Sequence, residues 1–298
     1  MKYSNLLQTI GNTPMIKLEK ILDNKNVNLF AKLEGQNPGG SIKDRAALYM
    51  IEQAEKSGEL KKGKIILEAT SGNMGIALAM IGAQKGYEVQ IVMSEGMSEE
   101  RKTMLKALGA KLILTDKSLG TGGAINKAKE LAESAPFLYW FSNQFNNQNN
   151  VLAHYHGVAG EILNEVSQVD YLIAGIGTSG TIIGIASRFK KDSPKTKIIG
   201  VFPPGGYKIQ GLQNPEEDFK GDIYKSELID EQFQVSKEDA FEMARKVAKK
   251  EGLFVGMSSG AALFAANEIS KSLESANIVV IIPDRGEKYL STELFAKI

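Results

Sequence analysis

A lysine stands directly after a glycine-rich turn in the segment Gly39-Gly40-Ser41-Ile42-Lys43-Asp44. The amphipathic pattern from Lys43 to Gly58 predicts a helix that begins at this lysine. At a helix start the macrodipole disfavours the ammonium form of a lysine, which helps to free its amine for Schiff-base chemistry. Taken alone, the position is more typical of a solvated surface lysine, so the interpretation depends on the rest of the chain.

Three further turns combine glycines with hydroxyl or amide side chains and lead into helix-like runs. Such a turn can direct backbone N–H groups and side-chain donors at an anion bound at a helix start. The turns are Thr70-Ser71-Gly72-Asn73-Met74-Gly75, Gly175-Ile176-Gly177-Thr178-Ser179-Gly180-Thr181 and Gly256-Met257-Ser258-Ser259-Gly260.

The second of these turns also fits the dinucleotide pattern G-x-G-x-x-G, which is the competing interpretation. Its second half is rich in hydroxyls, which suits a terminal phosphate better than a pyrophosphate. No acidic residue ends the next predicted strand, where Gly200-Val201-Phe202 stands instead. We therefore expect a phosphate monoester at this turn.

Strand-like apolar runs alternate with amphipathic helix-length runs over most of the chain, which predicts an α/β fold with largely parallel sheets flanked by helices. The expected strands are Lys64–Ala69, Glu88–Met93, Lys111–Leu114, Tyr171–Ala174, Lys197–Val201 and Ile278–Ile282. After the helix at Lys43, the expected helices are Asn73–Lys85, Ser98–Leu108, Gly122–Glu133, Val151–Glu165, Thr181–Lys190, Lys237–Glu251 and Gly260–Ser270.

Caps and loops complete the predicted organisation. Ser236 is expected to cap the helix from Lys237, and Gly109 and Gly252 stand where helix C-terminal glycines belong. The stretch from Pro203 to Gln234 is rich in Pro, Gly and acidic residues and is expected to be a long irregular connection.

Composition sets the broad class. The chain has 298 residues, long enough for two domains, and 36 basic residues against 35 acidic ones leave a net charge of +1. That balance gives no electrostatic reason to expect nucleic acid or an anionic membrane as partner. There are no cysteines, which excludes disulfides and thiolate chemistry. With no signal peptide and no long apolar span, the simplest location is the cytoplasm.

Metal and hydrolase chemistry are not expected. The two histidines, His154 and His156, are two positions apart and would point to different sides of a helix, so they do not form a paired metal site. The serine-rich turns have no histidine partner for a catalytic triad.

The four motifs, Asn37-Pro38-Gly39-Gly40-Ser41-Ile42-Lys43-Asp44-Arg45 and the three turns, resemble the cysteine synthase and cystathionine β-synthase family of fold type II pyridoxal phosphate enzymes. Similarity extends from Ile10-Gly11-Asn12-Thr13-Pro14 to Pro283-Asp284-Arg285-Gly286-Glu287-Lys288-Tyr289-Leu290-Ser291. The resemblance implies a tryptophan synthase β-like architecture and a homodimer. It implies a larger cofactor-binding domain of residues 1–45 plus 151–298, and a smaller, mobile inserted domain of residues 46–150.

The resemblance also implies roles for individual residues. Lys43 would be the catalytic residue, the lysine that binds pyridoxal 5'-phosphate and then serves as acid and base at the substrate Cα. The other implied cofactor contacts are Asn73, Gly177, Thr178, Ser179, Gly180, Thr181 and Ser258. The implied substrate contacts are Thr70, Ser71, Gly72, Asn73, Met74, Gln144 and Gly211.

Ser258 matches the family residue that hydrogen-bonds the pyridine nitrogen of the cofactor. A hydroxyl does not hold that nitrogen protonated as a carboxylate would, so loss of a β leaving group is favoured over transamination or racemisation. Local alternatives remain: Ser258 and Ser259 could cap a helix from Gly260, Asn73 could be a cap, and Gln144 could be an ordinary loop residue.

The chain departs from the family pattern at several places. Met74 replaces a usual threonine, and Gln148-Asn149-Asn150 replaces the more usual Pro-Ala-Asn. The segment after Gly211 is acidic where the family is often glycine-rich and apolar; one of its carboxylates could reach the site and activate water or select a cationic substrate, although a solvated loop is the more common explanation. The acidic candidates are Glu216, Glu217, Asp218, Asp222 and Asp230.

We therefore expect a β-replacement enzyme that uses a small amino-acid substrate and a sulfide, thiol or water nucleophile. Cysteine synthesis from O-acetylserine and sulfide is the leading hypothesis. The first alternative consumes cysteine, releases hydrogen sulfide and yields serine, lanthionine or cystathionine. The second is a binding or regulatory protein that kept the fold without turnover.

Overall fold

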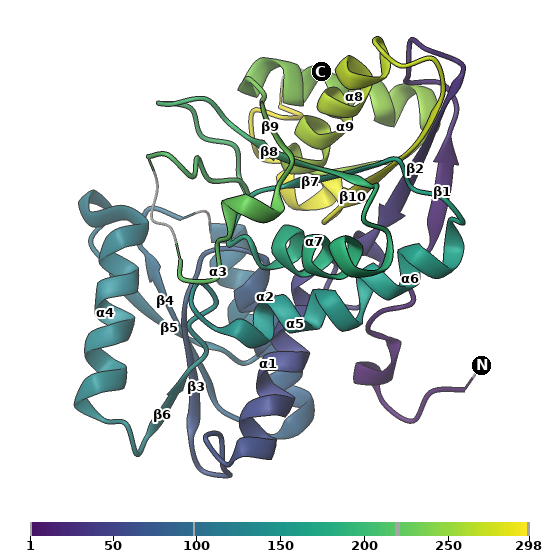
Figure 1. Cartoon of the computed structure of the whole chain (residues 1–298). Coiled ribbons are helices and arrows are strands. Elements are labelled where there is room, and N and C mark those ends of the chain that lie inside the picture. Colours follow the sequence, from purple (N-terminus) through teal and green to yellow (C-terminus); the bar gives the residue numbers. More distant parts are fainter. Residues whose placement is uncertain (1, 98, 218–220, 297–298) are drawn as a thin grey trace.

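The computed structural model describes residues 2–97, 99–217 and 221–296. Two sheets lie side by side in the molecule, each covered by helices (Figure 1). The expected start of a helix at Ser98, and the acidic candidate Asp218, lie outside the described residues.

The larger sheet has the strand order β1-β2-β10-β7-β8-β9. Only the pair β1–β2 is antiparallel, and the other neighbours run parallel. The strands are β1 (Met15–Leu18), β2 (Val27–Leu33), β7 (Tyr171–Gly175), β8 (Lys197–Phe202), β9 (Glu231–Gln234) and β10 (Ala276–Ile282).

Alternate residues of the central strands enter two separate apolar clusters, because successive side chains of a strand point to opposite faces. Val280 packs with α8 (Lys237–Glu251) and α9 (Met257–Ser270). Its neighbours Val279 and Ile281 pack with α5 (Gln148–His156), α6 (Val158–Glu165) and α7 (Gly180–Asp192).

The smaller sheet is wholly parallel, in the order β5-β4-β3-β6. Its strands are β3 (Ile65–Ala69), β4 (Val89–Ser94), β5 (Lys111–Thr115) and β6 (Tyr139–Phe141). One face packs on α1 (Lys43–Ser57), α2 (Asn73–Lys85) and α3 (Glu99–Ala107), and the other on α4 (Gly120–Ser134).

The predicted α/β class with largely parallel sheets is confirmed, and so is the start of α1 at Lys43. Ser236 caps α8 through Asp239 N, and Gly109 and Gly252 have φ of +86° and +70°, as helix C-terminal glycines do. No helix among the described residues has the length and apolar character needed to cross a bilayer.

Two predictions about elements were wrong. The single helix expected over 151–165 is divided into α5 and α6 at Gly157, where a Cβ would lie 2.7 Å from the Ala153 oxygen. The stretch 203–234, expected to be irregular throughout, contains β9, which extends the larger sheet beside β8.

In the sequence, the smaller sheet (residues 65–141) is inserted between the two segments that form the larger sheet. The domain boundaries expected near residues 45 and 150 fall within α1 and α5. The division into two domains, and the mobility of the smaller one, stay a proposal.

Candidate active site

Contacts on both sides of the glycine turn fix the start of α1. The Ile42 amide donates to the Pro283 oxygen at 2.9 Å, and the Gly39 amide donates to the Asp44 carboxylate at 2.5 Å. From this position the Lys43 amine reaches across to the larger sheet and donates to the Thr178 hydroxyl at 3.1 Å. Two motifs 135 residues apart, the lysine and the expected phosphate turn, are therefore in direct contact.

Burial lowers the pKa of Lys43 from 10.5 to about 8, and the charge of Glu68 opposes that shift. A buried ammonium loses its hydration, so the neutral amine gains relative to it. A sizeable fraction of neutral amine is thus present at mildly alkaline pH, as Schiff-base chemistry requires.

The turn between β7 and α7 has the form of an anion site. Ser179 has φ of +74°, a left-handed conformation rare outside glycine, and it precedes the first residue of α7 without capping the helix through its side chain. A Cβ on Gly177 would lie 2.6 Å from the Gly211 oxygen, so only glycine allows this close approach. The first-turn N–H groups of α7 have no partner within the helix and point toward the turn.

Of the two histidines of α5, one faces this turn and the other does not. His154 is fully buried with its Nε2 3.3 Å from the Thr181 hydroxyl, and burial holds the pKa of His154 well below 6.5, so the ring is neutral. His156 lies on the exposed side of α5, where it stacks on Tyr49.

Ser258 is 5% exposed and lies inside α9, which begins at Met257 after Gly256. The alternative in which Ser258 and Ser259 cap a helix from Gly260 is therefore wrong. Gly211, with φ of +91°, brings the long connection after β8 over this serine: a Cβ on Gly211 would lie 3.5 Å from the Ser258 oxygen.

Asn73 is the first residue of α2, and the residue before it, Gly72, is the cap. Its side chain instead donates to the Asp284 carboxylate at 2.7 Å and accepts from the Lys288 amine at 2.8 Å. These two contacts set which way the amide faces and leave its second N–H for a ligand. The alternative in which Asn73 is a cap is therefore wrong.

The turn before α2 is open at its centre. An added Cβ at Gly72 would meet no atom of the described residues within 4 Å, and the Gly72 amide contacts the Thr70 hydroxyl at 3.2 Å. Arg101 of α3 donates to the Ser71 oxygen at 3.2 Å and to the Gln210 side chain. The guanidinium thus joins the predicted substrate turn to the connection that carries Gly211.

Gln144 is buried beside a carboxylate that sequence reasoning missed. Glu68 of β3 is 1% exposed and accepts from Ser142 Oγ at 2.5 Å, from the Ala69 amide at 2.9 Å and from the Gln144 amide at 3.1 Å. Burial raises the pKa of Glu68, and these hydrogen bonds oppose the shift. A carboxylate within the apolar run Ile65–Ala69 was the signal that could have identified it.

Other predicted residues lie elsewhere. Met74 is 1% exposed and packs in the apolar cluster under α1 and α2, so its thioether is part of that core. Asp230 binds Lys190 and the Ile198 amide, and Glu217 binds the Gly206 amide. Asp222 is exposed, although its backbone amide lies against Asn146, two residues from Gln144.

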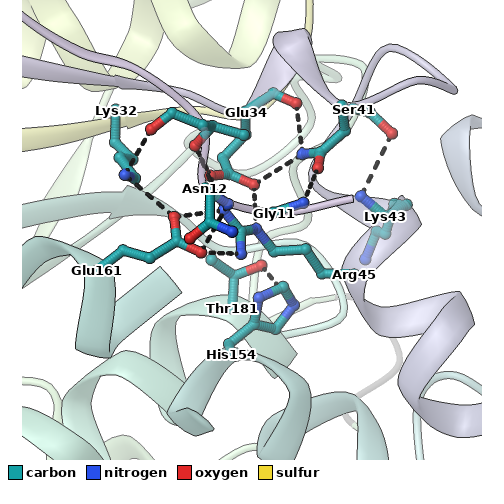
Figure 2. A network of polar contacts seen from close by, with 12 residues as sticks. Gly11, Asn12, Lys32, Glu34, Ser41, Lys43, Arg45, His154, Glu161 and Thr181 are labelled. Carbon is teal, nitrogen blue, oxygen red and sulfur yellow. Dashed lines mark hydrogen bonds and ion pairs between the residues drawn. The ribbon is translucent and has the colours of Figure 1, made fainter. Parts of the chain in front are cut away.

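A buried ion-pair network holds α1 in place (Figure 2). Arg45 binds Glu34 through Nε at 2.6 Å and Glu161 through Nη1 at 2.6 Å. Lys32, fully buried, binds the same Glu161 at 3.1 Å and the Thr13 oxygen at 2.7 Å. The N-terminal segment, β2 and α6 are thereby tied to the helix turn that carries Lys43.

The residues present fit a cofactor with an aldehyde and a terminal phosphate. The amine with lowered pKa and the uncapped start of α7 meet at Thr178. The Ser259 hydroxyl and the Asn150 amide oxygen are buried polar atoms without a hydrogen-bond partner among the described residues. Groups of this kind commonly serve a ligand or water.

Residues 6–284 match the model of the family described as pyridoxal-phosphate dependent enzyme. A cysteine synthase of Aquifex aeolicus is 45% identical over 98% of this chain and 92% of its own length. The structure of O-acetyl serine sulfhydrylase isoform 3 from Entamoeba histolytica has a TM-score of 0.94, 42% identity, and coverage of 100% and 93% of the two chains. That of a hydrogen sulfide-producing enzyme from Fusobacterium nucleatum has a TM-score of 0.91, 41% identity, and coverage of 97% and 100%.

Proposed function

This chain belongs to the pyridoxal-phosphate-dependent enzyme family, and on that premise we propose that it forms cysteine from O-acetylserine and sulfide. The observation that carries the proposal is the Lys43 amine 3.1 Å from Thr178, which brings a reactive amine and a phosphate site within one side-chain length. The likeness to cysteine synthases supports the choice of substrate.

Pyridoxal phosphate, when bound, draws electron density from the substrate Cα and so makes its proton acidic. Lys43 would hold the cofactor by its aldehyde carbon, and the turn Gly177–Thr181 would hold the phosphate. Ser258 would face the ring nitrogen and Asn73 the 3' oxygen. Each assignment follows the family resemblance, and the groups present fit it, since a hydroxyl and an amide both donate without carrying charge.

Lys43 is the base that we propose for the Cα proton, since the incoming substrate amine would take its place at the cofactor aldehyde carbon and so release the lysine amine. With a pKa of about 8 the neutral amine can accept that proton, and the ammonium so formed can return it at the end of the cycle. The β leaving group departs in between, and sulfide adds at the carbon it leaves. Replacing Lys43 by alanine is expected to lower kcat by about 10³-fold, within the range for a positioned acid–base group.

The substrate carboxylate would bind at the start of α2. We propose that the open space at Gly72 admits it, that Thr70, Ser71 and the Asn73 backbone donate to it, and that Gln144 donates from the opposite side. Glu68 acts by holding the Gln144 backbone, and Arg101 by linking the Ser71 turn to the segment before Gly211. Met74, packed in the core, shapes this turn from beneath.

A second candidate is the release of hydrogen sulfide from cysteine, which the similarity to the Fusobacterium nucleatum enzyme brings into consideration. If water is the incoming nucleophile in that reaction, a basic group must remove its proton, because neutral water is a weak nucleophile. Asp230 and Glu217 are engaged elsewhere, and Asp222 is exposed. The likeness to cysteine synthases supports the choice of cysteine synthesis over this second candidate.

Purified protein loaded with pyridoxal phosphate tests the proposal with two mixtures, O-acetylserine plus sulfide and cysteine alone. We expect the first to give cysteine and acetate far faster than the second gives sulfide. Lys43→Ala should lose this activity, while Lys56→Ala, at the exposed end of the same helix, should keep it. If the protein releases sulfide from cysteine faster than it forms cysteine, the second candidate is established. If neither mixture reacts while threonine is deaminated, β-replacement is refuted.

We further propose that the enzyme works as a homodimer in the cytoplasm and that residues 46–150 form a smaller domain which moves on substrate binding. The family resemblance supports the dimer and the domain division, and the absence of cysteine is in keeping with a reducing compartment. Light scattering and cell fractionation test the first two statements. Comparison of scattering profiles with and without substrate tests the third.

A further inference from the structure

Asn150, a buried side chain of α5, joins two parts of the site that come from distant motifs. It is fully buried, and its Nδ2 donates to the backbone oxygen of Gln144 at 2.8 Å and to the Thr178 hydroxyl at 3.2 Å. The orientation of the amide is fixed, because the Gln144 carbonyl can only accept a hydrogen bond. Asn150 therefore connects the predicted substrate-carboxylate residue with the predicted phosphate turn.

Thr178 receives two donors at once. Its hydroxyl oxygen accepts from the Lys43 amine at 3.1 Å and from Asn150 at 3.2 Å. A hydroxyl has two lone pairs and a single proton, so with both lone pairs engaged the proton must be given to a third group. At the start of α7, the fitting acceptor is an anion bound at the turn.

Gly180 makes room for this arrangement. A Cβ at this first residue of α7 would collide with the Asn150 amide, so the glycine lets the side chain lie against the helix start. The Asn150 Oδ1 has no hydrogen-bond partner among the described residues, and the buried amide is held by its two donated bonds. An unsatisfied acceptor is unfavourable when buried, which argues that the donated bonds have a function beyond packing.

We propose that Asn150 is a positioning residue that keeps the Thr178 hydroxyl turned toward the cofactor phosphate and ties this turn to Gln144. The inference rests on the proposed function, in which the phosphate lies at Gly177–Thr181. When the Lys43 amine is engaged with the cofactor, Asn150 is the donor that remains to orient Thr178. The side-chain amide of Asn150 thereby couples substrate binding at Gln144 to phosphate binding at Thr178.

Cofactor affinity and the phosphorus NMR signal of the bound cofactor test this proposal without any turnover. Asn150→Ala should raise the dissociation constant of pyridoxal phosphate about tenfold, the loss expected for one to two neutral hydrogen bonds. It should also shift the phosphorus resonance of the holoenzyme. Asn149→Ala, a partly buried asparagine one position earlier, is the matched control and should change neither.

A double-mutant cycle separates positioning from a general loss of packing. If Asn150 acts through the Thr178 hydroxyl, Asn150→Ala should have little further effect on cofactor affinity once Thr178→Val is present. Additive effects of the two substitutions would overturn the proposal. Should Asn150→Ala not fold, Asn150→Asp keeps the shape of the side chain and removes both N–H donors, and an unchanged dissociation constant in that variant would also overturn it.

Kinetics test the second half of the coupling. With the cofactor at saturation, Asn150→Ala should raise KM for the amino-acid substrate more than it lowers kcat, because the Gln144 oxygen has lost its partner. A lower kcat with unchanged KM would refute the link to Gln144. Because the binding experiments use no amino acid, an error in the substrate assignment would leave their outcome intact, whereas wild-type protein that binds no pyridoxal phosphate would refute the proposed function itself.

Discussion

Replacing Lys43 by methionine should make the cofactor-free protein more stable near neutral pH, and the gain should shrink as the pH rises. Burial lowers the pKa of Lys43 from 10.5 to about 8 in the folded protein. Between these two values the unfolded chain holds a proton that the folded protein does not. Stability of the wild type therefore rises with pH across that range, while a methionine at this position has nothing to titrate.

The magnitude follows from the two pKa values. A fall from 10.5 to about 8 corresponds to about 3.5 kcal/mol at roughly 1.4 kcal/mol per pH unit. Part of Lys43 still touches solvent, which screens the charge, so we take about half of this, ~1.7 kcal/mol. The stability difference between the variant and the wild type should decrease by that amount from pH 7 to about pH 10.5.

Urea unfolding at a series of pH values measures this difference. Trp140 is the one tryptophan of the sequence and is 6% exposed, so its fluorescence reports unfolding. Lys56→Met, at the exposed end of the same helix, controls for the loss of a lysine as such. A difference between Lys43→Met and wild type that stays constant from pH 7 to pH 10.5 would refute the reasoning, because it would mean that the folded protein holds this proton normally.

Three further predictions follow from the described contacts. Burial raises the pKa of Glu161, but hydrogen bonds from Arg45 outweigh this effect and lower the pKa to about 2, below the usual 4.5. The contribution of Glu161 to folding stability is therefore fully present above pH 4.5 and is lost as the pH falls toward 2. Glu161→Gln should thus cost about 1 kcal/mol less at pH 3.5 than at pH 7 in urea unfolding; an equal cost at both would contradict this. Gly177→Ala should weaken pyridoxal phosphate binding more than tenfold in equilibrium dialysis, and Gly160→Ala, whose Cβ would meet no atom of the described residues within 4 Å, should not; equal affinities would count against the close turn. Asp222→Asn should leave cysteine formation unchanged in a product assay, since its carboxylate is exposed; a clear fall in rate would place that acid in the reaction.

Local patterns predicted the parts of the site that are local. A glycine turn followed by an amphipathic run marks the start of α1 at Lys43, and the turn after β7 was recognised for the same reason. The contact between them joins residues 135 positions apart. Its existence was predicted through the family resemblance, and no periodicity in the sequence indicates it.

The missed features have physical reasons. In β2 the fully buried Lys32 interrupts the apolar pattern, and it is tolerated there because Glu161, Glu165 and the Thr13 oxygen compensate it. In β9 all four side chains are at least partly exposed, so no apolar alternation marks the strand. Glu68 and Asn150 have partners 76 and 28 positions away in the sequence, so no local pattern reveals their roles. Met74 was expected to contact the substrate, but its side chain is enclosed by the packing of α1 and α2.

The strand order of the larger sheet has a consequence for synthesis on the ribosome. β2 pairs with β10, and Leu29 lies opposite Ile278. This pairing cannot form until almost the whole chain has been translated. The smaller sheet needs only residues 65–141, all available long before. We expect the inserted unit to acquire its structure while β2, paired only with β1, still has an open edge where β10 will add, which makes that edge a candidate for chaperone binding.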